Sequence, residues 1–235
     1  MNNTRVIGIE GVPTAGKSSL CTEIGTEYEI CPEFAQYAGT MPSYPTNHSE
    51  IRSQCDHALT CEKNRRNDYN LTSQPLLIMD SSPLATLGYI YVTSTILNSN
   101  ILEEFLQEYI ERADRDEIFE PDAIVWLRPT HSTVTDRWEQ RGTDEFWTNP
   151  LVIKALNKMY EQICELLPSV VIDSTITEIS EETEITRQLI SDLDKKTQIY
   201  KIIYENRENV FNSPQELYGQ ERLLKSQRTE WPLNS

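Results

Sequence analysis

The sequence predicts an α/β fold with three layers, in which a five-stranded parallel sheet is flanked by helices and followed by a helical C-terminal extension. Two observations predict it. Short apolar runs with strand character alternate along the chain with segments of helical spacing, and this alternation is typical of a parallel sheet covered by helices. The 235 residues, 38% of them hydrophobic, are also enough to bury the core of one such domain.

The predicted strands are short, and most are rich in β-branched residues. They cover residues 5–10, 28–31, 76–79, 123–127 and 169–172. Between them, helical spacing predicts helices over residues 19–24, 49–69, 84–97, 102–119, 134–141 and 150–167. Four glutamates in residues 178–186 precede a further amphipathic stretch, which indicates a surface helix. These elements place the main domain in residues 1–197.

Residues 198–235 are predicted to form a separate extension. An apolar cluster that includes Ile199, Tyr200 and Ile203 indicates a helix, and the polar residues that follow indicate a loosely ordered tail. Packing of this extension on the domain is the preferred interpretation, with a partner-binding arm as the alternative.

Composition excludes several classes of protein. The formal net charge of -16 argues against a nucleic-acid polymer as partner, because polymer binding depends on many lysines and arginines. No apolar stretch approaches the length of a membrane span, and no signal peptide is expected. The five cysteines are scattered and odd in number, so no disulfide framework is expected. We therefore expect a cytoplasmic protein.

The first predicted strand leads directly into a glycine-bearing motif. This segment matches the pattern GxxxxGKS/T, called Walker A, and a predicted helix follows it. Backbone N–H groups of such a loop, together with the helix N-terminus, bind phosphate oxygens. The expected ATP-binding residues are Gly11, Val12, Pro13, Thr14, Ala15, Gly16, Lys17, Ser18 and Ser19. Lys17 adds a positive charge, and Ser18 is a candidate ligand for Mg²⁺.

Acidic residues follow the second and third predicted strands, at the edge of the sheet where ligands bind in open parallel sheets. Glu33 is the candidate general base, since a carboxylate there can accept the proton of an attacking hydroxyl. The alternative is a helix-capping or exposed glutamate. Asp80 is the second candidate Mg²⁺ ligand. Its alternative is a cap on the helix that follows.

Two arginines spaced four residues apart follow the fourth predicted strand. Arg137 and Arg141 lie on one helical face, within a predicted lid over residues 134–149. Guanidinium groups brought in by such a lid stabilise the charge on a transferred phosphoryl group. The alternative is surface pairing with neighbouring acids.

Four segments together resemble the deoxynucleoside kinase and thymidylate kinase group. They are residues 9–20, 31–34, 80–83 and 137–145, and the resemblance runs in order over residues 4–195. It implies a P-loop kinase fold, Glu33 as general base, and Arg137 and Arg141 as lid arginines. It also allows for a homodimer.

The sequence departs from this resemblance at two places. Ser81 stands where the family usually has a phosphate-contacting arginine, and residues 85–87 contain no base-reading acid. Arg65 or Arg66 is a candidate replacement for that arginine, the alternative being a solvated helix face.

No lysine or arginine lies between Lys17 and Arg52, where thymidylate kinases hold the phosphate of their acceptor. A neutral hydroxyl acceptor fits this absence better, because phosphate is normally held by basic groups. Phe34, Tyr37, Tyr44 and Trp147 offer aromatic surface for a ring, or are ordinary core and rim residues.

The sequence therefore predicts a kinase that uses ATP and Mg²⁺ and transfers the terminal phosphoryl group to a hydroxyl of a nucleoside-like small molecule. Three alternatives stay open. These are a thymidylate-type nucleoside monophosphate kinase, a kinase for a non-nucleoside metabolite or antibiotic, and a non-catalytic nucleotide-binding regulatory protein.

Overall fold

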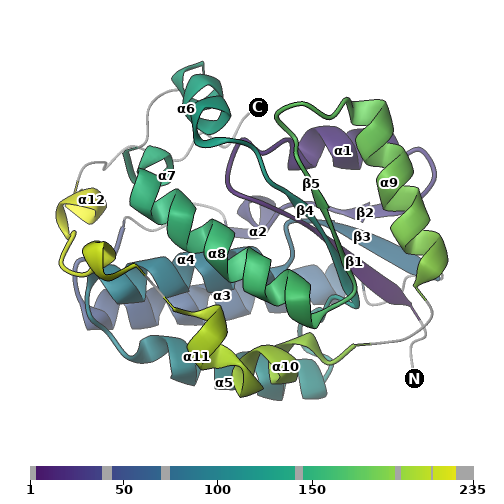
Figure 1. Ribbon diagram of the computed structural model, residues 1–235. Helices are drawn as coiled ribbons and strands as arrows, with labels where there is room; N and C mark the ends of the chain where they lie inside the picture. Colours follow the sequence, from purple (N-terminus) through teal and green to yellow (C-terminus); the bar gives the residue numbers. More distant parts are fainter. Residues whose placement is uncertain are drawn as a thin grey trace.

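A parallel sheet forms the centre of the computed structural model, which describes residues 4–38, 44–69, 75–140, 145–193, 197–212 and 214–225 (Figure 1). Among these residues the sheet has five strands: β1 (Arg5–Glu10), β2 (Glu29–Cys31), β3 (Leu76–Asp80), β4 (Ala123–Leu127) and β5 (Ser169–Ile172). Their order is β2-β3-β1-β4-β5, and every neighbouring pair is parallel. The predicted fold class and its five strands are confirmed.

Helices cover both faces of this sheet (Figure 1). One layer consists of α1 (Lys17–Ile24) and α9 (Ile179–Asp192), which pack against each other. The opposite layer contains α3 (His48–Asp68), α4 (Pro83–Ile96), α5 (Ile101–Asp114) and α8 (Pro150–Leu166). Three shorter helices lie along the connections: α2 (Ala35–Ala38), α6 (His131–Glu139) and α7 (Glu145–Thr148).

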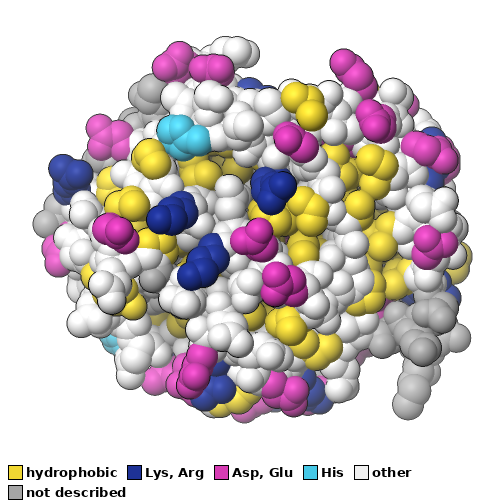
Figure 2. All heavy atoms as spheres, in the orientation of Figure 1, with side chains coloured by type: hydrophobic (Ala, Val, Ile, Leu, Met, Phe, Trp, Pro, Cys, Tyr) yellow, Lys and Arg dark blue, Asp and Glu magenta, His cyan; other side chains and the backbone are white. Residues whose placement is uncertain are grey.

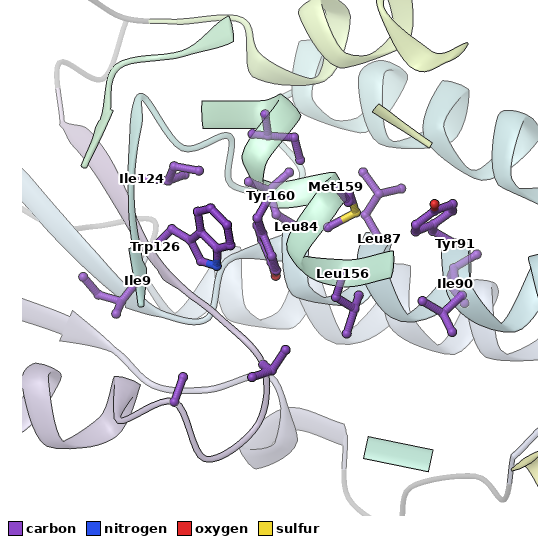
Figure 3. Packing of buried hydrophobic residues seen from close by; sticks show 14 of the residues in the cluster. Ile9, Leu84, Leu87, Ile90, Tyr91, Ile124, Trp126, Leu156, Met159 and Tyr160 are labelled. Carbon is purple, nitrogen blue, oxygen red and sulfur yellow. The ribbon is translucent and has the colours of Figure 1, made fainter. Parts of the chain in front are cut away.

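The core lies mainly between the sheet and the helices α4 and α8. Trp126 of β4 and Tyr160 of α8 stack with ring centroids 6.0 Å apart, and both are buried (Figure 3). Where α4 crosses α8, a Cβ atom on Gly88 would lie 3.0 Å from side-chain atoms of both Leu156 and Met159. Glycine is needed there because the two helices approach so closely.

The helix predicted over residues 102–119 ends earlier, at Asp114. Asp116 adopts a left-handed conformation with φ 58°, and the N–H of Glu117 donates to the carbonyl of Arg112, which closes the helix end. Ile118 and Phe119, which suggested a longer helix, are buried in the connection to β4 instead. Apolar residues in a buried loop produce the same sequence signal as a helix face.

The C-terminal extension packs against the domain over most of its described length. It forms α10 (Ile199–Glu205), α11 (Arg207–Val210), the 3-10 helix η1 (Gln215–Leu217) and α12 (Arg222–Lys225). These elements contact α5, α7 and α8. The expectation of a loosely ordered tail is therefore wrong for the described part of residues 207–225, where the buried apolar residues are Val210, Leu217, Leu223 and Leu224.

Two acids just before β4 hold the start of this extension. Asp122 accepts hydrogen bonds from the N–H groups of Val6 and Thr197, at 2.9 and 3.0 Å. Glu120 accepts one from the N–H of Tyr200 at the beginning of α10, at 3.0 Å. Burial raises the pKa of Glu120 to about 7. The first turn of α10 is thus fixed to the end of the sheet opposite the glycine motif.

The surface carries the acidic excess of the sequence. On the face shown in Figure 2, Asp and Glu side chains are spread around the molecule and mixed with a few Lys and Arg side chains. Within the described residues, no helix has both the length and the apolar character needed to cross a membrane.

Candidate active site

The glycine motif forms a tight loop between β1 and α1. Gly11 has φ 144°, and a Cβ atom there would lie 2.5 Å from the carbonyl oxygen of Leu127 in β4. Gly16, at the N-cap of α1, has φ 107°. Thr14 between them is also left-handed, with φ 67°. Such alternation turns successive N–H groups toward a concave surface that binds anions, so both glycines are required by the geometry of the loop.

Lys17 begins α1 and folds back over this loop. Its Nζ atom donates to the carbonyl oxygens of Gly11 and Val12, at 3.2 and 3.3 Å, and its side chain is almost fully buried. Ser18 and Ser19, the next residues of α1, are exposed. The loop therefore presents an ammonium group and a helix N-terminus to the same region.

The strand register places Asp80 and Glu33 relative to the loop. Cys21 of α1 has its pKa raised mainly by burial, and the charges that also act on it include Asp80, Lys17 and Glu33. Asp80 is in register with Ile9, two residues before the loop begins. Cys31, two residues before Glu33, is in register with Met79, next to Asp80, so both acids follow strands at the edge of the sheet where the loop lies.

Asp80 does not cap the helix that follows it. Ser82 is the N-cap of α4, and its side chain accepts a hydrogen bond from the N–H of Leu84. Asp80 itself is buried, and its Oδ1 atom has no hydrogen-bond partner among the described residues. A buried carboxylate oxygen without a partner fits a cation such as Mg²⁺, because buried polar atoms are normally satisfied.

Glu33 lies between β2 and α2. Its side chain is half-buried, and its carbonyl accepts a hydrogen bond from the N–H of Gln36 in the turn that starts α2. This position at the carboxyl end of a strand is the one expected for a group that acts on a bound ligand.

Arg137 of α6 contacts the loop directly. Its Nη1 atom donates to the carbonyl of Thr14 at 2.9 Å, and its Nη2 atom donates to the carbonyl of Ser174 at 3.0 Å. These bonds join α6 both to the loop and to the segment after β5. Arg141, the second predicted lid arginine, lies outside the described residues.

Glu10 is a buried acid beside the loop that the sequence reasoning did not single out. It is fully buried at the end of β1, where it accepts hydrogen bonds from the N–H of Ser82 at 2.8 Å and from the hydroxyl of Tyr160 at 3.1 Å. Burial is the main cause that raises its pKa from 4.5 to about 7. An acid in an otherwise apolar strand, directly before the loop, was the available sequence signal.

We expect Glu10 to make stability depend on pH. Its pKa is higher in the folded protein than the ordinary value, so its protonated form favours folding below about pH 4.5, and this contribution is lost as the pH rises through about 7. Wild type should therefore lose stability relative to Glu10→Gln as the pH rises from 5 to 8. The difference in unfolding free energy between the two proteins should change by up to about 3 kcal/mol in favour of the variant. Urea unfolding at both pH values measures this change.

The matched control is Glu23→Gln, which changes an exposed acid of α1. Its difference from wild type should be the same at both pH values. A constant difference between Glu10→Gln and wild type would contradict the predicted role of Glu10.

An aromatic cluster joins the connections after β2 and β4 to α4. Tyr44 lies 4.9 Å from Phe146 and 6.3 Å from Tyr89, and Tyr89 lies 6.0 Å from Trp147, measured between ring centroids. The hydroxyl of Tyr89 donates to the buried amide of Gln54 on α3, at 3.1 Å.

Part of this cluster was predicted. The structure places Tyr44 and Trp147 in this cluster, while Tyr89, Phe146 and Gln54 were not predicted; Tyr89 is far from the other members in the sequence. Phe34 packs at the margin of the core, and Tyr37 is half-buried on α2.

Arg65 and Arg66 do not form a solvated helix face. Arg65 is fully buried and pairs with Glu62 and with the carbonyl of Ser81. Arg66 is nearly buried and pairs with Asp116. Neither arrangement is an exposed phosphate clamp, and the expectation of a solvated face is wrong for both residues.

The fold, with its parallel sheet, glycine loop and flanking helices, is similar to that of a solved deoxyadenosine kinase. Deoxyadenosine kinase from M. mycoides with bound dATP matches it with a TM-score of 0.56 and 20% sequence identity, over 80% of this chain and 100% of that chain. The same enzyme with products dCMP and a flexible dCDP bound gives 0.56 and 21%, over 79% and 98%. No family model matches the chain, and no curated protein matches it in sequence. The likeness therefore establishes the fold.

Proposed function

We propose that this protein is a magnesium-dependent kinase that transfers the terminal phosphoryl group of ATP to a hydroxyl of a nucleoside-like small molecule. The observation that carries this proposal is the position of Glu33 and Asp80 after the ends of the neighbouring strands β2 and β3, at the edge of the sheet where Lys17 folds over a loop with the GxxxxGKS pattern. These are a cation, a base and a metal ligand at one edge of the sheet. Phosphoryl transfer requires little more than these groups held in position.

The donor half consists of the loop and α1. In this proposal residues 11–19 bind the ATP phosphates through N–H groups, and Lys17 releases the carbonyls of Gly11 and Val12 to contact the phosphates. Ser18 and Asp80 would hold Mg²⁺. Bound there, the ion would neutralise phosphate charge and orient the terminal group.

The acceptor half is built around Glu33. Its carboxylate accepts the proton of the acceptor hydroxyl, while that oxygen forms a bond to the terminal phosphorus and the bond to the bridging oxygen breaks, which releases ADP. Arg137, already bound to Thr14, and Arg141 stabilise the charge on the transferred group. In this scheme residues 1–197 are the kinase domain, residues 134–149 its lid, and residues 198–235 an extension.

A neutral acceptor with a flat ring fits the remaining residues. The absence of lysine and arginine between Lys17 and Arg52 leaves no early clamp for an acceptor phosphate. The guanidinium groups of Arg65 and Arg66 both pair with carboxylates. The aromatic cluster with Gln54 offers ring surface and an amide, which together suit a nucleobase. A nucleoside acceptor is also in line with the similar fold of deoxyadenosine kinase, whose name states a nucleoside substrate.

A coupled assay of ADP release across nucleosides, nucleoside monophosphates and non-nucleoside alcohols tests this proposal. We expect turnover with one or more nucleosides, dependence on Mg²⁺, and none with Lys17→Met, which controls for contaminating kinases. Turnover restricted to monophosphates or to non-nucleosides would overturn the proposed acceptor class. ATP binding without transfer to any acceptor would favour a regulatory protein.

A further inference from the structure

We propose that Arg65, held by Glu62, is a positioning residue that fixes the turn after β3 and so directs the Asp80 carboxylate toward the phosphate loop. The inference rests on the proposed function, because it assigns Asp80 to the metal. It concerns a buried ion pair of α3 that takes no direct part in the scheme above.

The pair is unusually well buried for two charged side chains. Arg65 and Glu62 are both 0% exposed, and Nη1 of Arg65 lies 3.1 Å from each carboxylate oxygen of Glu62. Removing two charges from water is costly, so an apolar pair of similar volume is commonly as stable. The stability of the fold therefore gives no sufficient reason for this pair.

The second guanidinium nitrogen of Arg65 provides a reason. Nη2 donates to the carbonyl oxygen of Ser81 at 2.9 Å. Ser81 is left-handed, with φ 60°, a conformation that costs a non-glycine residue free energy unless its surroundings hold it. Arg65 thus supplies a charge-assisted bond at a strained position.

Hydrogen bonds from β1 hold the same turn from the other side. The N–H of Ser81 donates to the carbonyl of Ile9 at 3.1 Å, and the N–H of Ser82 donates to Glu10 at 2.8 Å. The peptide groups on both sides of Ser81 are therefore fixed. Asp80 immediately precedes this turn, and its Oδ1 atom is left without a partner among the described residues. The turn sets the direction in which that carboxylate points.

The neighbouring arginine provides an internal comparison. Arg66 lies on the same helix and is also nearly buried, but it pairs with the exposed Asp116 and lies 5.0 Å above the ring of Phe119. Its guanidinium is thus directed to the loop after α5. Removing that pair tests the loss of a buried arginine from α3 without removing the bond to Ser81.

The test compares wild type with the double variant Glu62→Leu and Arg65→Met, which removes both charges together. The control is Arg66→Met with Asp116→Asn. We expect the double variant to melt within a few degrees of wild type, to lose at least 10-fold in kcat, and to need several-fold more Mg²⁺ for half-maximal activity. Its KM for the acceptor should be unchanged. The control should keep the kcat and the Mg²⁺ dependence of wild type.

Calorimetric ATP binding with and without Mg²⁺ separates this inference from the proposed function. If the wild-type protein transfers no phosphoryl group, the proposed kinase function is wrong. The role of Arg65 is then tested by the effect of Mg²⁺ on ATP binding alone. We expect Mg²⁺ to strengthen ATP binding to wild type and to the control, but several-fold less to the double variant. Equal strengthening in all three, or a wild-type Mg²⁺ dependence in the double variant, would overturn the role of Arg65.

If the double variant does not fold, the test uses Arg65→Lys instead. This variant keeps a buried cation opposite Glu62. A lysine lacks the planar fork that binds Glu62 and Ser81 together. We expect this variant to fold and to show a several-fold weaker response to Mg²⁺. A folded Arg65→Lys with the wild-type response would contradict the inference.

Discussion

Replacing Glu33 by Gln is expected to lower kcat by about 10²- to 10⁴-fold, the range in which a positioned general base contributes. The amide keeps the size of the side chain but cannot accept the hydroxyl proton. ATP affinity should change little, because the proposed scheme assigns the donor phosphates to the loop and Lys17 and not to Glu33. Steady-state kinetics with the best acceptor, together with calorimetric ATP binding, measures both quantities.

The control for Glu33→Gln is Glu29→Gln, which changes another half-buried acid of the same segment, at the start of β2. It lies at the opposite end of that strand from Glu33, so its kcat should equal that of wild type. If Glu33→Gln also turns over at the wild-type rate, Glu33 is not the general base and the acceptor half must be assigned to other residues.

Ending the chain at Thr197 is expected to abolish stable folding of the domain. The removed elements bury Ile199, Tyr200 and Ile203 against α5 and α8, and Leu217 near α8. Each fully buried side chain of this kind contributes about 1.5–3 kcal/mol, so their joint loss is comparable with the whole stability of a typical domain. We expect the truncated chain to aggregate or to melt at least 10 °C lower, measured by size-exclusion chromatography and circular dichroism.

Two point variants test whether buried side chains of the extension, rather than its length of chain, stabilise the domain. Leu217→Ala removes a fully buried side chain and should cost about 2–5 kcal/mol. Tyr218→Ala, at the next position, changes a residue that is 52% exposed and should cost less than about 1 kcal/mol. A truncated chain that is monomeric and as stable as wild type would show that the extension is a dispensable arm.

The features that were predictable from the sequence are local ones. The strand β1, the loop and the start of α1 follow one another within 24 residues, and the motif itself requires glycines at Gly11 and Gly16. Glu33 and Asp80 were also accessible, because each directly follows an apolar run and the ends of parallel strands meet at one edge. Their position at the same edge of the sheet as the loop follows from this topology.

The features that were missed depend on contacts between distant residues. In the sequence Glu10 is an ordinary strand end. Its partners, the N–H of Ser82 and the hydroxyl of Tyr160, are distant in the sequence. Arg65 has the sequence context of a solvated helix, with acids and polar residues around it, yet its partners are Glu62 and the carbonyl of Ser81. The hydrophobic periodicity of a sequence does not indicate such a contact, because the burial of a charged side chain depends on where its partner lies in the fold.

Helix ends were the least predictable part of the secondary structure. The helix α6 starts at His131, three residues before the predicted start, because the side chain of Thr130 caps it by accepting from the N–H of Thr133. The elements after α10 were read as a loose tail because their apolar residues are few and widely spaced. Those residues are nonetheless buried, since the domain supplies the rest of the apolar surface.

Transfer of labelled phosphate tests the central claim most directly. Wild-type protein, Mg²⁺ and ATP labelled in its terminal phosphoryl group are incubated with the nucleosides, and the labelled product is identified. The account predicts that the label enters a nucleoside monophosphate and that Glu33→Gln slows its entry by about two to four orders of magnitude. Label found only in inorganic phosphate, or only in a nucleoside diphosphate formed from an added monophosphate, would contradict it.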